Sequence, residues 1–384
     1  MLRYFTTKIY LLYSKTQMAS TLIAEHELVE RFVETLRALP QVTNQSEMEP
    51  VTLRLAEPGQ PYDAQVALRL SGKTITLLIE AKTILYPRDA RLVLWRLQEF
   101  IDRWNSKPNT HQVVPVLIAD SISPGAKELL RGERAGYFDS GGSLFLVACG
   151  IYLHIDKPSP RQASRLVRSL FAGRRAQVLH AMLTRREGRF EVTALAEEAK
   201  VSPATASQVL QELERLEWVV SRGRGPNKVR YLQEPGALLD AWAKQAAAMP
   251  AQTMRRFYVP LTRADELVER LDRTLAGHAV EHEITHEAAG QRYAPFLSSV
   301  SRVHCRLLAG RQADRAIGEL GARVVSQGTN LAVVEAKSPG ELLFRQRLNG
   351  IWLASPIRVY LDLLRGEGRA KEMAEHLRRE KIGF

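Results

Sequence analysis

The segment of residues 173–232 constrains the fold more than any other, because its periodicity, capping residues and turn residues agree on one structure. Apolar side chains recur at helical spacing in residues 171–186 and again in residues 193–199. Ser202 is a suitable N-cap residue and Pro203 suits the first helical position, so a third helix is predicted to begin there. That helix would turn five apolar residues towards a core: Ala206, Val209, Leu210, Leu213 and Leu216.

A strand, a turn and a second strand are predicted after the third helix, which should end near Glu217. Residues 218–221 and 229–232 have the composition of strands, and residues 222–227 between them contain two glycines and a proline. Three helices followed by such a hairpin are typical of a winged helix-turn-helix. In that module the third helix enters the major groove of duplex DNA and the hairpin, called the wing, follows a phosphate backbone.

The same part of the chain concentrates positive charge. Residues 161–232 hold 14 Lys and Arg against 7 Asp and Glu, a net charge of +7 out of +12 for the whole chain. Polar residues of the third helix would face the bases, and basic residues would contact phosphates. The predicted DNA-binding residues are Arg174, Arg175, Ser202, Ala204, Thr205, Ser207, Gln208, Gln211, Arg222, Arg224, Lys228 and Arg230. The alternative is a winged helix that mediates protein contacts only, with its basic residues solvated.

Composition is typical of a multi-domain globular protein. With 45% hydrophobic and 25% charged residues, the 384-residue chain can form two or three hydrophobic cores. Cys149 and Cys305 are too few for a disulfide scaffold or a cysteine-built zinc site, which favours a reducing, cytoplasmic compartment. No apolar run reaches the roughly 18 residues that span a bilayer, so no membrane association is expected. Residues 1–17 lack a signal-peptide cleavage site and are either an upstream extension before Met18 or part of the natural protein.

The residues before the winged helix are predicted to form a mixed sheet with helices on its faces. The spacing of apolar residues changes from helical to alternating after residue 39, and helices and strands then alternate up to residue 155. Residues 157–160 form a stiff, polar linker. The predicted helices are 25–39, 87–105 and 124–132, and the predicted strands are 51–55, 64–70, 74–79, 113–119, 143–148 and 151–155.

Three residues of this first domain form a candidate catalytic site. Glu80 and Lys82 project from the same side of a strand, because strand side chains alternate between faces. The neighbouring hairpin strand can bring Asp63 beside them. The carboxylates of Asp63 and Glu80 would bind Mg²⁺, and the Lys82 ammonium would stabilise the charge that develops in phosphodiester cleavage.

An acid, a Glu-x-Lys tripeptide and a glutamine on the next helix, Gln98, follow one another here as in the PD-(D/E)XK nuclease superfamily, which this domain resembles. The resemblance implies a restriction-endonuclease-like fold. It also implies an Mg²⁺-dependent DNA endonuclease in which Asp63, Glu80, Lys82 and Gln98 are catalytic, with Asp63 and Glu80 as metal ligands. The alternative is a surface Glu/Lys pair at the end of a strand.

Two further motifs are weaker signals. A second Glu-Ala-Lys tripeptide occupies residues 335–337, but no strand-borne acid precedes it, since Asp314 lies in a predicted helix. Residues 282–286 (HEITH) match the H-E-x-x-H motif of zinc peptidases, which requires both histidines on one helix. Here residues 280–284 alternate like a strand and Thr285 is a predicted N-cap. The two imidazoles are therefore expected to point in different directions.

The residues after the winged helix are predicted to form a second α/β domain. They contain no Gly-Ser turn followed by paired strand-borne carboxylates, as a nucleotidyltransferase requires, so this domain is expected to bind rather than to catalyse. Its predicted helices are 263–276, 285–297, 312–320 and a pair within 355–379, and its predicted strands are 280–284, 303–308 and 331–335. The whole chain is thus predicted to be α/β, with a nuclease-like domain at 22–157, the winged helix at 161–248 and the C-terminal domain at 250–384.

The order of these features resembles a known bacterial family. Asp63 with residues 80–82, the segment of residues 137–143 (YFDSGGS), the winged helix and residues 355–364 (SPIRVYLDLL) together resemble the AbiEi-type antitoxins of type IV toxin–antitoxin systems. The resemblance implies a DNA-binding protein that represses its own operon and counteracts a cognate nucleotidyltransferase-like toxin. Three hypotheses follow: a transcriptional regulator or antitoxin, an Mg²⁺-dependent endonuclease targeted by its winged helix, and an inactive scaffold that joins DNA to a partner. Each is compatible with a homodimer.

Overall fold

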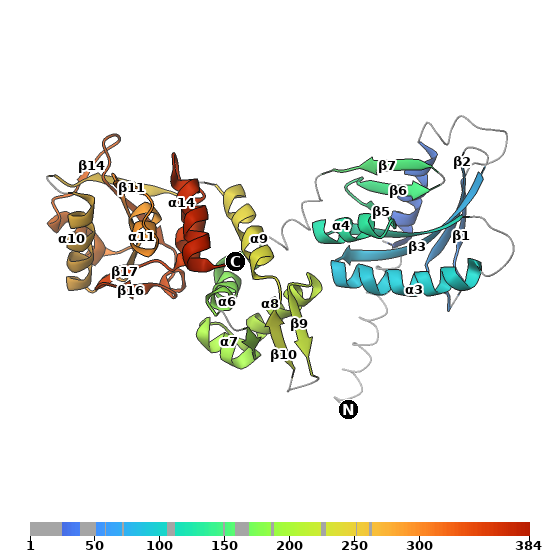
Figure 1. Ribbon diagram of the computed structural model, residues 1–384, viewed down its shortest axis with the longest axis horizontal. Helices are drawn as coiled ribbons and strands as arrows, with labels where there is room; N and C mark the ends of the chain where they lie inside the picture. The colour runs from blue at the N-terminus through green and yellow to red at the C-terminus, as the bar shows by residue number, and fades with distance from the viewer. Residues whose placement is uncertain are drawn as a thin grey trace, which may run out of the picture. The chain divides into compact units, whose positions relative to one another are not determined.

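The protein is a mixed α/β chain in a computed structural model (Figure 1). The structure describes residues 25–38, 51–57, 59–70, 73–105, 112–148, 150–157, 169–185, 188–223, 228–250, 252–260 and 263–384. The chain forms two compact units, one of residues up to 167 with 215–217, and one of residues 168–214 with 218–384. The predicted turn at 71–72, most of the predicted linker, Cys149, Arg224 and residues 1–17 lie outside the described residues.

The first unit contains a seven-stranded sheet in which each strand pairs with the next in sequence. The pairs from β3 to β4 and from β4 to β5 are parallel, and the others are antiparallel. The carboxyl ends of three strands therefore lie at one edge of the sheet. The strands are β1 (Val51–Leu55), β2 (Ala64–Leu70), β3 (Lys73–Leu85), β4 (Gln112–Ile122), β5 (Gly136–Asp139), β6 (Leu144–Ala148) and β7 (Ile151–Ile155).

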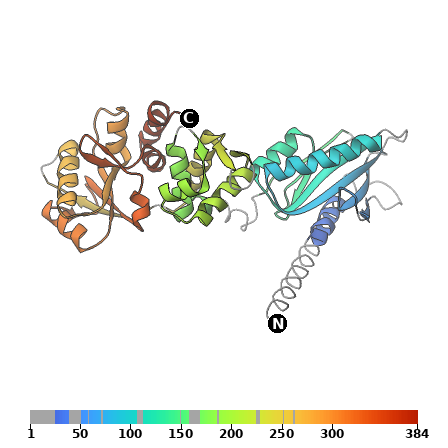
Figure 2. The same ribbon diagram turned by 90° about the horizontal axis from the view of Figure 1, so that it is seen from below.

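Helices cover both faces of this sheet (Figure 2). A helix over residues 25–37 buries Phe32 and Leu36 against one face, where Leu77 and Phe138 lie. On the other face, α3 (Pro87–Asn105) and α4 (Pro124–Gly132) bury a second set of apolar residues. The predicted bounds of α3 and α4 are confirmed. The short strand β5 has no counterpart in the prediction, because four residues give too little alternation to identify a strand.

The second unit begins with a small α/β segment. Its helices are α6 (Gly173–Thr184), α7 (Val192–Glu198) and α8 (Pro203–Arg215), and a three-stranded sheet pairs β8 with β10 and β10 with β9. The strands are β8 (Arg189–Phe190), β9 (Val219–Arg222) and β10 (Val229–Leu232), and α9 (Pro235–Ala248) follows them. The predicted helices and hairpin strands are confirmed to within a few residues, whereas the two-residue β8 was not predicted.

A second seven-stranded sheet, of mixed parallel and antiparallel strands, occupies the rest of this unit in the order β14-β11-β15-β13-β12-β17-β16. Figure 1 shows α10 and α14 on opposite sides of it. The strands are β11 (Met254–Tyr258), β12 (His282–Thr285), β13 (Val303–Leu308), β14 (Arg323–Val324), β15 (Leu331–Ala336), β16 (Gln346–Leu348) and β17 (Ile351–Leu353). The helices are α10 (Ala264–Gly277), α11 (His286–Tyr293), α12 (Arg311–Glu319), η2 (Pro339–Leu342), α13 (Pro356–Leu363), α14 (Ala370–Leu377) and η3 (Arg378–Ile382).

The two parts of the second unit pack together around His180 of α6. Its ring stacks on Phe344 with centroids 4.4 Å apart, lies edge-on to Trp242, and its Nε2 is 2.5 Å from the Ser355 hydroxyl. Burial, aided by the Arg358 guanidinium, lowers the pKa of His180 to about 3. His180 is therefore a neutral packing residue between α6, α9 and α13. The predicted three-domain division stays a prediction. Within the described ranges, every helix is too short or too polar to traverse a bilayer.

Candidate functional site

A tight turn joins α7 to α8. Lys200 takes a left-handed backbone conformation with φ +52°, and Val201 N donates to Ala196 O at 2.9 Å, which reverses the chain within three residues. The Ser202 hydroxyl then accepts a hydrogen bond from Thr205 N at 3.2 Å, so the predicted N-cap is confirmed. The turn and the cap together fix the direction in which α8 leaves α7.

The amphipathic helix α8 separates its buried and exposed residues cleanly. Ala206, Val209, Leu210 and Leu213 are buried, as predicted, and Leu216 beyond the helix is half-buried. The candidate base-contacting residues lie on the remaining face: Ser202, Ala204, Gln208 and Gln211 are exposed, and Thr205 and Ser207 are half-buried. Within this group the Gln211 amide donates to the Ser207 hydroxyl at 3.5 Å. The accessible start of α8 is therefore polar and carries no charge.

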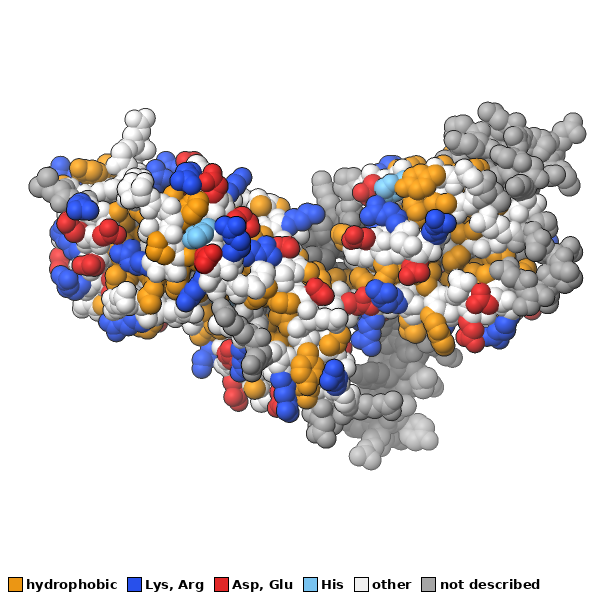
Figure 3. All heavy atoms as spheres, viewed as in Figure 1, with side chains coloured by type: hydrophobic (Ala, Val, Ile, Leu, Met, Phe, Trp, Pro, Cys, Tyr) orange, Lys and Arg blue, Asp and Glu red, His pale blue; other side chains and the backbone are white. Residues whose placement is uncertain are grey.

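The predicted basic residues fall into two groups. Arg174 and Arg222 are exposed, and the Arg222 guanidinium lies 5.5 Å from the centroid of the Tyr231 ring. Figure 3 shows basic and hydrophobic side chains side by side over β9 and β10. By contrast, Arg175 is paired with Glu212 and also donates to the Ser169 hydroxyl at 2.8 Å. Its guanidinium is thus engaged inside the segment.

Two more predicted phosphate contacts are joined to α8 instead. Arg230 is only 5% exposed and its Nε lies 2.7 Å from Glu214 Oε1, while Lys228 Nζ lies 2.9 Å from Glu214 Oε2. Burial opposes ionisation of the Glu214 carboxyl, but the hydrogen bonds from Lys228 and Arg230 outweigh burial and hold its pKa below the usual value. The buried acid therefore joins β10 to α8. Sequence charge alone did not distinguish these internal cations from accessible ones.

In the first unit, the structure brings Asp63, Glu80 and Lys82 to one strand end. Strand β2 begins at Ala64, which pairs with Ile79, so β3 has no β2 partner from Glu80 onward, and Asp63 Oδ2 accepts the Ala81 N–H at 2.7 Å. Lys82 Nζ lies 2.7 Å from Glu80 Oε1 and donates to Ala81 O at 3.0 Å. We call these three residues the acid–lysine cluster. The alternation that predicted a shared face for Glu80 and Lys82 accounts for their pairing.

The helix residue that meets this cluster is Arg96, not Gln98. Arg96 Nη2 lies 3.0 Å from Glu80 Oε1, the same oxygen that Lys82 contacts. The Gln98 amide donates to Asp102 on the exposed side of α3. Two residues rotate a helix by about 200°, so Arg96 and Gln98 cannot both face the strand. Among the described residues, no hydrogen bond joins Gln98 to Asp63, Glu80 or Lys82.

Glu25 is a further carboxylate near the cluster that the sequence did not single out. Burial raises the pKa of the Glu25 carboxyl, and the Asp63 and Glu80 carboxylates raise it further against the opposing effect of Lys82. The sequence feature that could have identified Glu25 is its position in the first turn of the helix that packs on β3. An acid there would be brought close to the end of the strand that carries Glu80.

The acid–lysine cluster, as it is arranged, does not fit a divalent metal ion. One Asp63 oxygen is held by a backbone N–H, and one Glu80 oxygen is shared by two cations, Lys82 and Arg96. Across the ranges that the structure describes, no group of three or more His, Cys, Asp or Glu side chains is placed to hold a metal. A metal would have to displace Arg96 before it reached the Glu80 oxygen that faces α3.

The H-E-x-x-H segment is split between a strand and a helix, as predicted. Strand β12 ends at Thr285 and α11 begins at His286. His282 Nε2 lies 2.9 Å from Asp272, whereas the His286 ring stacks on His304 with centroids 4.0 Å apart. The two imidazoles therefore have separate partners.

Glu283 of this segment belongs to a buried ion-pair network. Its Oε1 lies 2.7 Å from Arg306 Nη1, and Arg306 Nη2 lies 3.0 Å from Asp362 Oδ2, with Arg306 fully buried. Thr285 donates its hydroxyl to Asp362 at 2.6 Å. Burial raises the pKa of the Glu283 carboxyl. It also opposes ionisation of Asp362, whose pKa Arg306 nonetheless holds well below its usual range. These charges neutralise one another inside the sheet, which suits a structural role.

Comparisons of this chain with protein-family models, with curated proteins and with solved structures found no match.

Proposed function

We propose that the protein binds duplex DNA through the segment from α6 to β10. The observation that carries this proposal is the element order α6, β8, α7, α8, β9, β10 with the strand order β8-β10-β9. This order supports a winged helix-turn-helix, in which a third helix follows a tight turn and a hairpin adds to a strand between the first two helices. In this proposal α8 is the recognition helix and β9–β10 is the wing.

The exposed start of α8 supports contact with base edges. Gln208 and Gln211 are exposed and can present an amide donor and acceptor to one base, the geometry by which glutamine recognises adenine. The absence of charge on the exposed positions at the start of this helix means that phosphate attraction does not dominate there. The proposed interface therefore recognises sequence modestly through amides and hydroxyls, and it gains affinity from basic residues on either side.

The accessible basic residues set the expected electrostatics. Arg174 and Arg222 are exposed, whereas Arg175, Lys228 and Arg230 already have acidic partners. Lys228 and Arg230 would act by fixing the wing against α8 rather than by neutralising phosphates. The salt dependence of binding should thus be weaker than the five cations together would produce, since each neutralised phosphate contributes a slope of about 0.9.

A titration of the full-length protein against fluorescent duplex DNA over a range of salt concentrations tests this proposal. Arg222→Gln should reduce the slope of log affinity against log salt by about 1. Arg256→Gln removes the same charge from an exposed site on β11, outside the winged helix, and is the matched control. Unchanged slope in the Arg222 variant, or an equal reduction in both variants, would remove β9–β10 from the interface.

The regulator or antitoxin role is proposed from the resemblance of four sequence segments to AbiEi-type antitoxins. A protein with this role would bind the promoter of its own operon, so a reporter gene behind that promoter should be repressed by the wild type and released by Gln208→Ala. Co-expression with a nucleotidyltransferase-like toxin encoded beside it tests the antitoxin part separately. Survival of the host only in the presence of this chain is the expected result.

An endonuclease is the second candidate function, supported by the convergence of Asp63, Glu80 and Lys82 on one strand end. The ion pair between Arg96 and Glu80 weighs against it. Incubation with supercoiled plasmid and Mg²⁺ distinguishes the two: nicking that is lost in Lys82→Ala supports an endonuclease, because that lysine would stabilise the transition state. If the plasmid stays intact, the endonuclease proposal is contradicted and only the DNA-binding proposal remains.

A further inference from the structure

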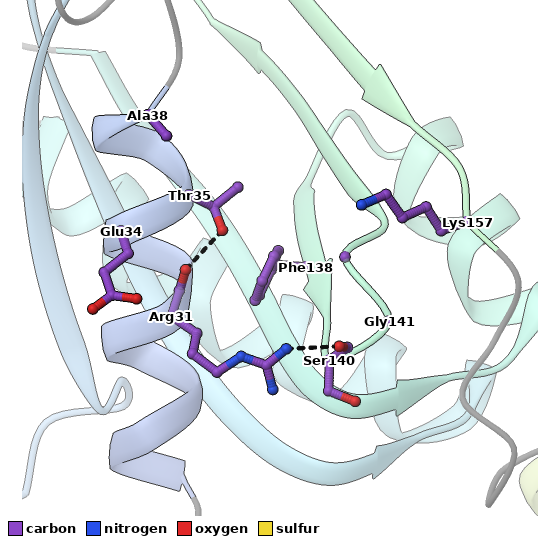
Figure 4. A pocket seen from close by; sticks show the side chains of 9 residues that line it. Arg31, Glu34, Thr35, Ala38, Phe138, Ser140, Gly141 and Lys157 are labelled. Atoms are coloured by element: carbon purple, nitrogen blue, oxygen red, sulfur yellow. Dashed lines mark hydrogen bonds between the residues drawn. The ribbon is translucent and has the colours of Figure 1, made fainter.

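A hollow of about 400 Å³ lies on the first unit between the helix of residues 25–37 and the loop that follows β5 (Figure 4). The loop is the Ser140-Gly141-Gly142 part of the YFDSGGS segment, to which neither proposed function assigns a chemical role. Arg31 and Thr35 approach it from the helix, and Lys157 approaches it from the end of β7. Two cations from distant parts of the sequence therefore face one short loop.

The loop is held rigidly from below. Asp139 and Ser143, at its two ends, are fully buried, and Ser143 N donates to Asp139 Oδ1 at 3.0 Å. Lys127 Nζ lies 2.7 Å from Asp139 Oδ2 and donates to the Ser143 hydroxyl at 2.7 Å. Gly142 has φ +87°, which a side chain would strain. Asp139, Ser143 and Lys127 thus hold the Ser140–Gly142 loop in one conformation, and we call these residues and the loop the platform.

The cations above the platform are positioned by backbone contacts. Arg31 Nη2 donates to Ser140 O at 2.8 Å, which uses one of its five N–H groups. The Ser143 hydroxyl donates to Lys157 O and accepts from Lys157 N, both at 3.1 Å, so the root of the lysine side chain is fixed. Within the described part of the chain, no ion pair joins Arg31 or Lys157 to a carboxylate. Their charges remain available to a ligand.

We propose that this hollow binds a phosphate group between Arg31 and Lys157 over the Ser140–Gly142 loop. Two cations that lie beside the same loop, neither of them paired with a carboxylate of the described residues, favour a compact anion. Hydrogen bonds that involve a charged group are about twice as strong as neutral ones. Glycine in the loop lets the anion approach the backbone closely. Glu34 also lines the hollow, but in Figure 4 its carboxylate turns away from Lys157.

The position in the sheet suits a ligand site. Lys82, Ala119 and Asp139 stand in one row across β3, β4 and β5, at the carboxyl ends of these parallel strands. Ligands of open α/β sheets bind outside such ends. The row places the hollow about two strand spacings, roughly 10 Å, from the acid–lysine cluster along one edge. The inference concerns the first unit alone and does not depend on the proposed duplex binding by α8.

Calorimetric titration of the full-length protein with inorganic phosphate, at constant ionic strength in chloride, tests the site. Lys157→Gln changes an exposed side chain and should weaken phosphate binding about tenfold, the loss expected for one charge-assisted contact. Arg54→Gln removes one exposed charge from β1, at the far edge of the same sheet, and should leave binding unchanged. Arg31→Gln should weaken binding at least as much as Lys157→Gln.

Two further ligands identify the source of the phosphate group. Thymidine 5′-monophosphate offers a monoester, and the dinucleotide of two thymidines offers one phosphodiester in a molecule too short for a winged helix. Binding of phosphate and monophosphate but not of the dinucleotide would support a free nucleotide or phosphate as ligand. Binding of the dinucleotide as well, lost in Lys157→Gln, would support a nucleic-acid backbone.

No binding of any of the three ligands to the wild type would overturn the proposal. Binding that is equally strong in Lys157→Gln and Arg31→Gln would overturn it too, because the anion would then sit elsewhere. Neither result would affect duplex binding by α8, which the salt titration of Arg222→Gln measures independently.

Discussion

The tripeptide Glu-Ala-Lys occurs twice in this protein, within β3 and at the end of β15, and the two copies differ in chemistry. In β3 the Glu80 side chain is 7% exposed and is contacted by Lys82 and Arg96. In β15 the Glu335 side chain keeps 47% of its surface exposed, and its contact with Arg255 is longer, at 3.4 Å. The same tripeptide thus holds a nearly buried glutamate beside two cations in one sheet and a half-exposed glutamate in the other.

The neighbouring segments cause this difference. Strand β2 starts late enough for Asp63 to take the place of a ladder partner at Ala81. At Glu335, β15 pairs with β13 but no longer with β11, and the residue that reaches Glu335 from β11 is a cation, Arg255, which also pairs with Asp314 at 2.8 Å. A short motif therefore acquires its chemistry from what the adjacent strands supply, and the tripeptide alone predicts little.

The second sheet also contains a buried ion-pair network. Arg306 of β13, opposite Val334 of β15, contacts both Glu283 and Asp362. The largest expected effect in this comparison is therefore Arg306→Ala, which removes the cation that contacts both buried carboxylates and leaves, among the described Lys and Arg residues, only Arg358 near both. It should lower the free energy of unfolding by about 3–5 kcal/mol. Urea denaturation followed by tryptophan fluorescence measures the loss.

Arg255→Ala is the matched control for this change, because its two ion pairs are exposed. It should cost less than about 1 kcal/mol. A similar cost for both variants would mean that burial does not distinguish the two arginines.

Metal binding sharpens the contrast at the acid–lysine cluster. Because Arg96 shares the Glu80 oxygen with Lys82, Mg²⁺ should raise the melting temperature of the wild type little. Arg96→Met should permit binding at Glu80 and Asp63, and a concentration of Mg²⁺ about ten times the dissociation constant then stabilises by about 1.4 kcal/mol. Thermal melting with and without Mg²⁺ provides the measurement. A saturable rise in the wild type that is lost in Asp63→Ala would contradict the blocking role of Arg96 and favour the endonuclease.

The two glutamates can be compared directly by neutral substitution. Glu80→Gln removes the negative charge of a nearly buried side chain that two cations contact. It should cost about 1–2 kcal/mol, at the lower end of what hydrogen bonds to charged groups contribute, because both cations are partly exposed. Glu335→Gln should cost under about 0.5 kcal/mol, as expected for an exposed pair. Chemical denaturation of the two variants in parallel gives the difference. Equal costs would show that Glu80 and Glu335 contribute equally to stability.

The smallest effect concerns Glu25. Its pKa is raised in the folded protein, chiefly by burial and then by the Asp63 carboxylate, so the ionised form destabilises the fold at neutral pH. Glu25→Gln should therefore increase stability slightly at pH 7, by less than about 0.5 kcal/mol. The gain should vanish below pH 4.5, the usual pKa, where the carboxyl is protonated in both states. Melting curves at pH 7 and pH 4 test the sign, and a loss of stability at pH 7 would contradict it.

Much of the fold could be predicted from the sequence where periodicity was long. The bounds of α3, α4 and β10 agree with expectation, and a proline marks the start of each of the two helices. The short strands β5, β8 and β14 could not be predicted, since two to four residues carry no detectable period and depend on pairing partners far away in the sequence.

The site residues were predictable only as far as local geometry determines them. Alternation along β3 placed Glu80 beside Lys82, and antiparallel pairing brought Asp63 to them. Which residue of α3 faces the strand depends on the rotation of the helix about its axis, and the sequence alone does not determine that rotation. Arg96 was therefore not predicted as a partner of Glu80. Likewise, Arg230 of β10 is buried because it pairs with Glu214 of α8, and a count of charges along the sequence does not reveal this contact.

The most direct test of duplex recognition by α8 is the affinity of Gln208→Ala for two duplexes, one carrying a sequence selected by the wild type and one with that sequence scrambled. We expect a loss of about 1–3 kcal/mol on the selected duplex and almost none on the scrambled one. Gln98→Ala, which truncates an exposed glutamine of α3, should change neither affinity. Equal losses on both duplexes, or no loss on either, would contradict base recognition by this helix.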